Sequence, residues 1–580
     1  MASLAGVAPG CRGGGEGLDE AIGAGEEQQA ATEFGRPAPV ANVQSASETR
    51  MLRTLNDLAS FGEKRAGTTG GKKAGDYVKW RFHQANLCDV RFEEFSLNAF
   101  NVTSSTLTLT ASANGQSRPL AVAGHQVFAY SGVGALENVE VVDVGVGKAT
   151  SYVSSVQGKV VLVRAAQDFH RSNQLALALE QGAVGMISVS FAPSNLVQVG
   201  GVSPAELGLG PAPAVSIGGA DGKAISDAIV AGETVRATLR VDATLSTQKG
   251  RNVVGRLSSS HSQPGDPYIL VGAHYDTWST GATDNGTGIA SMLEIASTLS
   301  RWPSRNYDVV FVGYDAEELG LLGGYDYLRR HVVRDGDSIV AFVNLEMTGM
   351  AKAEFQGNLV PRFFVYSQGS PLAEVAGEAN LASVYPQLLG LENVAPIVGG
   401  NIPTDVQGLY WSGIDGSIAF GGSPFYHTVA DTPSTIDTAF LANNTVVLRN
   451  FLDHLDQEPA VSFQPKDPTL LYPEVTLNTD NPSTTRVEVT VRDANGQLVA
   501  SPWARVQIYV DDFVTPQPVG ITASSGVQEL TGGVDGKVSF DISSAVLRSG
   551  SGGRWVHVRV GTEPNRVPRI PRGERVLEVY

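Results

Sequence analysis

Three continuous runs of apolar residues mark the middle of the chain, at 268–271, 309–312 and 339–343. Within each run the apolar residues do not alternate with polar ones, which is typical of strands that are buried on both faces of a sheet. Stretches with helical spacing separate the runs. We therefore predict an α/β domain over residues 246–462, with a largely parallel sheet between two helical layers.

The region before these runs predicts two helices and two strands. Met51, Leu52, Leu55 and Leu58 recur on one helical face, and a second helical stretch follows over 75–85. Residues 90–95 and 104–110 then alternate as strands. We assign 46–117 to the first part of the same domain. Residues 1–45 are rich in Gly, Ala, Glu and Gln without periodicity, which predicts a flexible tail.

Residues 118–245 have the pattern of an inserted unit. Residues 139–144 and 159–163 are strand-like, 172–181 is helical, and Gly182-Ala183 turns into another buried strand. This order, with Arg164 after the second strand, resembles the protease-associated domain, which covers or shapes a peptidase site and carries no chemistry. The cysteine often found in that motif is absent here.

The pattern of apolar and polar residues changes again after residue 464. Residues 487–491, 506–510, 538–542 and 555–560 alternate with period two, and Asn495-Gly496 and Asp535-Gly536 are typical of tight turns. We predict a C-terminal β-sandwich over 465–580. Its sequence offers no aromatic cluster or metal motif that indicates a role.

Charge and composition argue against several classes of binding partner. The chain has 42 Lys plus Arg against 59 Asp plus Glu, a net charge of −17, which argues against nucleic acid and anionic membranes. No apolar run reaches the roughly 20 residues of a transmembrane helix. Because Cys11 and Cys88 are the only cysteines, any metal must be held by histidine and carboxylate ligands.

The first residues leave the cellular location open. Ala8-Pro9-Gly10-Cys11 has the small-residue-then-cysteine pattern of the end of a lipoprotein signal whose start is truncated. This pattern favours a secreted or lipid-anchored protein. A tail with an incidental cysteine, and a cytoplasmic location, is the alternative.

Acidic and imidazole side chains follow each of the three buried runs. His274 and Asp276 end the first, Glu317 and Glu318 follow the second, and Glu346 ends the third. Open α/β sheets bind ligands at the carboxyl ends of their strands. Carboxylates gathered there would repel one another, and a divalent cation removes that cost.

The spacing of the polar residues within these segments also suits metal binding. His274 and Asp276 point to the same side of an extended strand, so the Asp276 carboxylate can accept a hydrogen bond from the ring nitrogen of His274 that does not bind metal. Glu317 and Glu318 are adjacent and diverge, so that one can ligate a metal while the other reaches a water molecule.

At these residues the chain resembles the co-catalytic zinc aminopeptidase family, which also contains glutamate carboxypeptidase and the transferrin receptor. The family pattern is His-x-Asp, an Asp before a helix, Glu-Glu, a carboxylate after Asn-x, and a late His. Here these motifs are His274-Tyr275-Asp276, Asp284, Glu317-Glu318, Glu346 and His427. The family usually has Asp where Glu346 stands, so the ligand must approach from further back.

The resemblance implies a di-zinc site and a mechanism. Asp284 would bridge two Zn²⁺, one held also by His274 and Glu346 and the other by Glu318 and His427. A zinc-bridged hydroxide would attack a peptide substrate, with Glu317 as general base. Tyr426 would donate to the oxyanion.

The remaining polar residues are not predicted to bind metal. Asp405 lies where relatives keep an Asp-containing loop, which suggests a substrate contact. Seven histidines are read as structural, namely His83, His125, His170, His261, His331, His454 and His557.

The sequence therefore predicts a zinc-dependent exopeptidase, with aminopeptidase activity favoured. A carboxypeptidase or dipeptidase is the first alternative, because Asp276-Thr277-Trp278 resembles that branch. A glutaminyl cyclase and a catalytically dead binding module are weaker alternatives, since all five ligand positions are retained. Side-chain preference and oligomeric state stay open.

Overall fold

The computed structural model describes residues 46–579, and the predicted tail at 1–45, with Cys11, lies outside the described residues. Further positions outside the description are 167–169, 203–208, 211, 302–304, 356–361, 368–369, 392–403, 412–413, 464–471, 482–483, 493–496, 512–516, 520–526, 544–552 and 562–573.

A large mixed sheet forms the centre of the molecule. Its first half has the order β13-β12-β14-β11-β9-β10-β8. The four inner strands are parallel to one another, whereas β8 is antiparallel to β10. The bounds are β8 (Thr234–Leu257), β9 (Tyr268–His274), β10 (Asp308–Tyr314), β11 (Ile339–Glu346), β12 (Phe363–Tyr366), β13 (Gln387–Gly390) and β14 (Gly416–Phe420). This arrangement confirms the α/β fold with a parallel centre.

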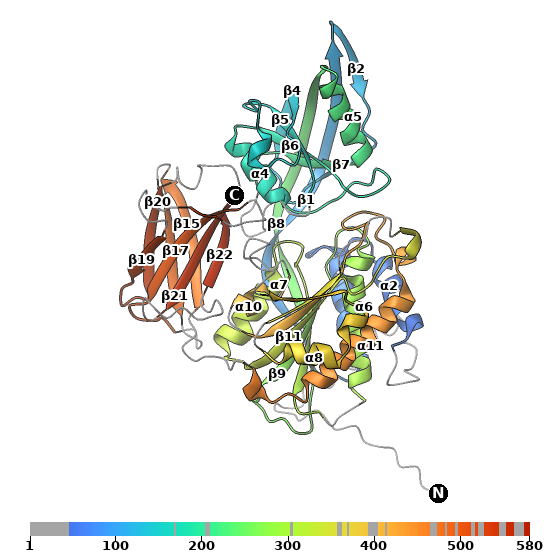
Figure 1. The fold of residues 1–580 in the computed structure, drawn as a ribbon, viewed down its shortest axis with the longest axis vertical. Helices are drawn as coiled ribbons and strands as arrows, with labels where there is room; N and C mark the ends of the chain where they lie inside the picture. The colour runs from blue at the N-terminus through green and yellow to red at the C-terminus, as the bar shows by residue number, and fades with distance from the viewer. Residues whose placement is uncertain are drawn as a thin grey trace.

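Apolar side chains fill both faces of this sheet. Along β9, Ile269 and Val271 enter one hydrophobic cluster, while Leu270 enters another on the opposite face. All seven residues of β9 and of β10 are buried, which is why neither strand alternates in the sequence. Helices therefore lie on both sides of the sheet (Figure 1).

The helices divide between the two faces. Those packed on the first cluster are α3 (Thr69–Gln84), α6 (Gly288–Leu299), α8 (Leu372–Glu378) and α11 (Thr438–Leu455), with α2 (Glu48–Ser60) beside α6 and α11. The second face carries α7 (Leu322–Tyr327) and α10 (Gln407–Trp411).

Two long strands connect this domain with the predicted insert. β1 (Cys88–Ala113) pairs antiparallel with β8 from Cys88 opposite Arg256 to Ser112 opposite Thr234. The two predicted strands at 90–95 and 104–110 are therefore parts of one strand, interrupted by a register shift between Val102 and Ser104. Figure 1 shows both strands rising from the lower domain into the upper unit.

The upper unit continues the same sheet in the order β8-β4-β5-β6-β7-β3. Its strands are β2 (Gln116–Leu120), β3 (His125–Val127), β4 (Gly134–Asp143), β5 (Val160–Arg164), β6 (Gly185–Val189) and β7 (Ala214–Ile217), with helices α4 (Arg171–Glu180) and α5 (Gly219–Val230). The predicted boundaries at 118 and 245 fall inside β2 and β8, because paired strands cross them without a break.

The C-terminal region consists of antiparallel strands in two sheets. One has the order β15-β16-β20, and the other β18-β17-β21-β22 with β19 paired to β17. The bounds are β15 (Tyr472–Asn481), β16 (Thr484–Arg492), β17 (Trp503–Asp511), β18 (Gln517–Val519), β19 (Val527–Thr531), β20 (Lys537–Ser543), β21 (Gly553–Gly561) and β22 (Glu574–Val579). Across the described part of the chain, none of the helices has the length and apolarity needed to cross a bilayer.

Candidate metal centre

Four neighbouring strands bring the predicted polar residues together at one edge of the sheet. His274 is the last residue of β9 and Glu346 the last of β11, while Glu317 and Glu318 follow β10. Asp284 lies in a tight helical turn, Ala282–Thr287, that leads into α6. His427 lies in the loop after β14. The strand order β14-β11-β9-β10 makes these segments spatial neighbours.

The five predicted ligands form two groups that share Asp284. In the first, Nε2 of His274 lies 3.3 Å from Asp284 Oδ1 and 3.2 Å from Glu346 Oε1. In the second, Nε2 of His427 lies 3.1 Å from Asp284 Oδ2 and 3.0 Å from Glu318 Oε2. The ligand atoms of each group all lie within 4.8 Å of one another. Each carboxylate oxygen of Asp284 thus faces a different histidine.

This donor set fits a metal better than a hydrogen-bond network. Among the described residues, Oε1 of Glu318, Oε2 of Glu346 and Nε2 of His427 are buried without a hydrogen-bond partner. Buried polar atoms normally have partners. Imidazole nitrogen and carboxylate oxygen are zinc ligands, and tetrahedral bonds of about 2.0 Å separate neighbouring ligand atoms by about 3.3 Å. The observed separations match that edge length.

The pKa shifts of the clustered side chains also favour a bound cation. Burial raises the pKa of Glu346, and the nearby carboxylates of Asp284 and Glu318 add to the effect although His274 opposes it. Burial disfavours ionised Asp284, but the two imidazoles facing it hold its pKa below the usual range. Glu318 and Asp284 raise the pKa of His427 to about 9 against the effect of burial. The site therefore concentrates negative charge that a cation would neutralise.

The hydrogen-bond partner of the His274 Nδ1 atom is the backbone of Asp276 rather than the carboxylate that the spacing predicts. Nδ1 of His274 lies 2.9 Å from the backbone oxygen of Asp276 and 3.6 Å from its carboxylate Oδ1. The carboxylate instead accepts hydrogen bonds from the backbone N–H groups of Glu317 and Glu318, at 3.0 and 3.2 Å. The backbone therefore fixes the His274 ring, and the Asp276 side chain orients the Glu-Glu turn.

Two buried residues that the sequence analysis did not single out hold the Asp284 turn. Asp431, 1% exposed, accepts hydrogen bonds from the backbone N–H groups of Thr283 at 2.9 Å and Asp284 at 3.1 Å. Asn285 donates to the Leu345 carbonyl at 2.8 Å and accepts from the Met347 N–H at 2.9 Å. These bonds tie the Asp284 turn to the end of β11. Backbone contacts of this kind leave no pattern in a sequence.

A buried lysine also lies close to the centre. Lys64, between α2 and α3, is 0% exposed and donates to the Thr280 carbonyl at 2.5 Å. Burial lowers the pKa of Lys64 to about 8, although Asp431 and Glu63 oppose the shift. Lys64 fixes the loop between His274 and Asp284, so it belongs to the support of the site rather than to its ligands.

The predicted catalytic groups surround the ligands. Burial raises the pKa of Glu317 well above its usual range, and the neighbouring carboxylates of Glu318 and Glu346 add to this, while His274 opposes it. The Tyr426 ring stacks on the His427 ring, with centroids 3.7 Å apart. Asp405 is 2% exposed, and its carboxylate has no hydrogen-bond partner in the described part of the chain. Burial raises the pKa of Asp405.

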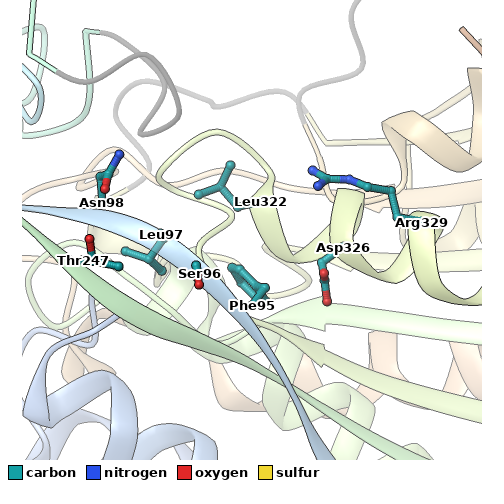
Figure 2. Close-up of a pocket in the computed structure, with 8 residues that line it drawn as sticks. All are labelled: Phe95, Ser96, Leu97, Asn98, Thr247, Leu322, Asp326 and Arg329. Carbon is teal, nitrogen blue, oxygen red and sulfur yellow. The ribbon is translucent and has the colours of Figure 1, made fainter. Parts of the chain in front are cut away.

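A separate pocket of about 390 Å³ lies between the β1–β8 pair and α7. Figure 2 shows Phe95 to Asn98 of β1 on one side and Leu322, Asp326 and Arg329 on the other. None of the predicted catalytic or ligand residues lines this pocket. It is therefore distinct from the metal centre.

Comparisons with known proteins identify a peptidase family to which part of the chain is similar. Residues 252–452, which contain all five ligand positions, match the family described as Peptidase family M28. The chain is 25% identical to aminopeptidase YwaD of Bacillus subtilis over 390 residues, covering 65% of this chain and 78% of that protein. It is 31% identical to a glutamate carboxypeptidase 2 homolog of Caenorhabditis briggsae over 116 residues, or 19% of this chain and 14% of the relative.

A solved structure shares the fold. The zinc aminopeptidase BSAP from Bacillus subtilis superposes with a TM-score of 0.53 at 21% identity, over 72% of this chain and 98% of that one. The likeness extends well beyond the matched segment 252–452.

Proposed function

We propose that this chain, whose residues 252–452 form a Peptidase family M28 domain, is a zinc-dependent exopeptidase that removes N-terminal residues from peptides. The observation that carries the proposal is Asp284, whose two carboxylate oxygens each face a different histidine at 3.3 and 3.1 Å. A bridging carboxylate flanked by two N/O donor sets is what a pair of zinc ions requires.

Two zinc ions are proposed, each held by three protein ligands. His274, Asp284 and Glu346 would hold one, and Asp284, Glu318 and His427 the other. Glu346, although longer than the usual Asp, approaches to 3.2 Å from the His274 ring nitrogen, so its extra methylene does not prevent it from joining the set. Zinc bound there would polarise the scissile carbonyl and acidify water.

Glu317 is proposed as the general base. Its carboxylate would take the proton from the attacking water and later deliver it to the leaving nitrogen. Asp276 would act as a positioning residue, since its carboxylate holds the backbone of Glu317 and Glu318. Tyr426 would donate a hydrogen bond to the developing oxyanion.

Aminopeptidase activity is favoured over carboxypeptidase activity by the extent of the likeness. The aminopeptidase of Bacillus subtilis matches over 390 residues, whereas the glutamate carboxypeptidase homolog matches over 116. Glutaminyl cyclisation and a dead binding module are disfavoured by the full set of five ligands.

Two accompanying units are part of the proposal. Residues 118–245 would be a protease-associated domain, supported by Arg164 at the end of β5 and by the Gly182-Ala183 turn before β6. Residues 465–580 would be a β-sandwich, supported by contacts of β15 with β21 and of β17 with β20 between the two sheets. An extracytoplasmic location is proposed from the sequence Ala8-Pro9-Gly10-Cys11.

Metal analysis and two substrates test the function. Purified protein should contain two equivalents of zinc and should release the chromophore from an amino-acid anilide. Release of an amino acid from an N-blocked dipeptide, without anilide hydrolysis, would replace the aminopeptidase by a carboxypeptidase. Protein that takes up no zinc would contradict the metallopeptidase proposal itself.

A further inference from the structure

One loop of the inserted unit touches a metal-ligand residue directly. Nδ1 of His427 lies 2.9 Å from the carbonyl oxygen of Val199, and the Val199 N–H donates to the His427 carbonyl at 2.9 Å. The side chain of Gln198 donates to the carbonyl of Tyr426 at 3.2 Å. Val199 and Gln198 thus hold both the ring and the backbone of the segment 426–427.

The loop is itself anchored within the insert. The Ala129 N–H donates to the Gly200 carbonyl at 2.8 Å, and the Val202 N–H donates to the Ala129 carbonyl at 3.0 Å. Nε of Arg171, at the start of α4, donates to the Gly201 carbonyl at 2.6 Å. A Cβ added at Gly200 would lie 2.3 Å from the Arg171 guanidinium, so a larger residue would displace Arg171 from its bond to Gly201. Hydrogen bonds within the insert therefore hold the loop that contacts His427 in place.

The hydrogen bond to Val199 decides which nitrogen of His427 is available. A carbonyl oxygen accepts only from a protonated nitrogen, so Nδ1 carries a hydrogen and Nε2 is the nitrogen left for a metal to bind. Nε2 is the atom that faces Asp284 and Glu318. Such outer partners fix the orientation of a ligand ring and raise its basicity.

Within the described residues, the insert forms no hydrogen bond with the half of the centre that contains His274. His274 is held by the backbone oxygen of Asp276 in its own chain segment, and Asp284 and Glu346 belong to the same α/β domain. Only the half that contains His427 receives a supporting hydrogen bond from the insert among the ring contacts described.

We propose that the insert is a working part of the metal centre, in which Val199 and Gln198 act as positioning residues for His427 and so control zinc affinity at one of the two sites. This inference rests on the proposed di-zinc function. It assigns to residues 198–199 a role in metal binding rather than in covering the site.

Zinc titration of metal-depleted full-length protein by calorimetry tests the inference. V199P removes the N–H that holds His427, and Q198A removes the bond to Tyr426, while V199A keeps both backbone groups and serves as the matched control. We expect one of the two affinities to fall about 10-fold in V199P, the lower end of the range for altered outer partners, because the Val199 carbonyl stays but the backbone bond that places it against Nδ1 is lost. Q198A should shift the same site in the same direction, and V199A should leave both affinities unchanged.

A second variant identifies the affected site. H427A removes the ligand itself, so the affinity that survives in H427A should equal the affinity that is unchanged in V199P. Equal weakening of both sites in V199P and Q198A, or no change in either variant, would overturn the inference. Wild-type protein that binds no zinc would instead refute the proposed function, so the two failures are distinguishable.

Discussion

Glu317 and Glu318 are adjacent, yet the structure gives them different surroundings. Oε2 of Glu318 lies 3.0 Å from the His427 ring, whereas Glu317 is absent from both ligand groups. Glu317→Gln should lower kcat about 10²- to 10⁴-fold because the proposed general base is lost. Zinc content should stay at the wild-type value. Assays of turnover and metal on the same preparation check this.

The neighbouring glutamate is the matched control. Glu318→Gln should lower zinc content as well as turnover, because the substituted carboxylate belongs to one of the two proposed ligand sets. If Glu317→Gln retained wild-type turnover, Glu317 would have no part in proton transfer.

Asp431 provides a second test at the scale of single residues. Its carboxylate accepts from the N–H groups of Thr283 and Asp284, and burial raises the pKa of Asp431 to about 6. Asp431→Asn replaces one acceptor oxygen by an N–H₂ group that cannot accept. We expect zinc affinity to fall about 10-fold as the Asp284 turn loosens, measured by competition with a chelating dye.

Asp437 supplies the control for that substitution. It caps α11 by accepting from the Phe440 N–H at 2.9 Å, and Asn caps helices about as well as Asp. Asp437→Asn should therefore leave zinc affinity unchanged. An equal loss in both variants would mean that Asp431 has no specific role.

At the scale of elements, an ion-paired histidine joins β1 to the segment before β11. His331 lies 3.0 Å from the Glu93 carboxylate and 3.1 Å from that of Asp337, and these partners raise its pKa to about 9 against the effect of burial. A raised pKa stabilises the fold fully below the unfolded value of about 6.5, and this stabilisation is lost as pH rises through about 9.

His331→Gln should therefore destabilise the protein most at acidic and neutral pH. The loss should be at most about 3 kcal/mol near pH 6 and should vanish towards pH 10. Thermal unfolding of both proteins across this range measures it. His454→Gln, which removes an exposed pair with Glu378, should change little at any pH. A pH-independent difference for His331→Gln would contradict the assignment.

The elements also show what the sequence could and could not predict. The strands β9, β10 and β11 were predicted because burial on both faces produces unbroken apolar runs, and their ends placed His274, Glu317, Glu318 and Glu346 correctly at one edge. The length of β1 was missed because residues 101–106, which join the two predicted strands, are mostly polar and exposed, so no alternation marks the connection. The contacts of Lys64, Asp431 and Val199 were missed because each involves a backbone group and joins residues far apart in the chain.

At the scale of the whole molecule, the metal centre joins segments from residue 274 to residue 427. Three buried carboxylates lie within it, and burial raises the pKa of both Glu318 and Glu346. Removal of zinc by a chelator should therefore lower the melting temperature. A ligand that binds only the folded state at 1,000 times its Kd contributes about 4 kcal/mol.

Calorimetric scans with and without chelator measure this shift. Added zinc should restore the original melting temperature, and His427→Ala should show a smaller shift than the wild type because one ligand set is incomplete. A melting temperature that does not respond to the chelator in the wild type would exclude a stabilising metal.

The pairing of β1 with β8 has a consequence for dissection of the protein. Ser112 and Thr234 stand opposite each other in the ladder, so a chain cut at these points could be rejoined by a two-residue turn as an ordinary hairpin. Excision of residues 113–233 would thus keep β1 and β8 paired with each other. The excision would nevertheless leave the His427 imidazole without its carbonyl acceptor, and a minimal enzyme built this way would need a substitute for that one oxygen atom.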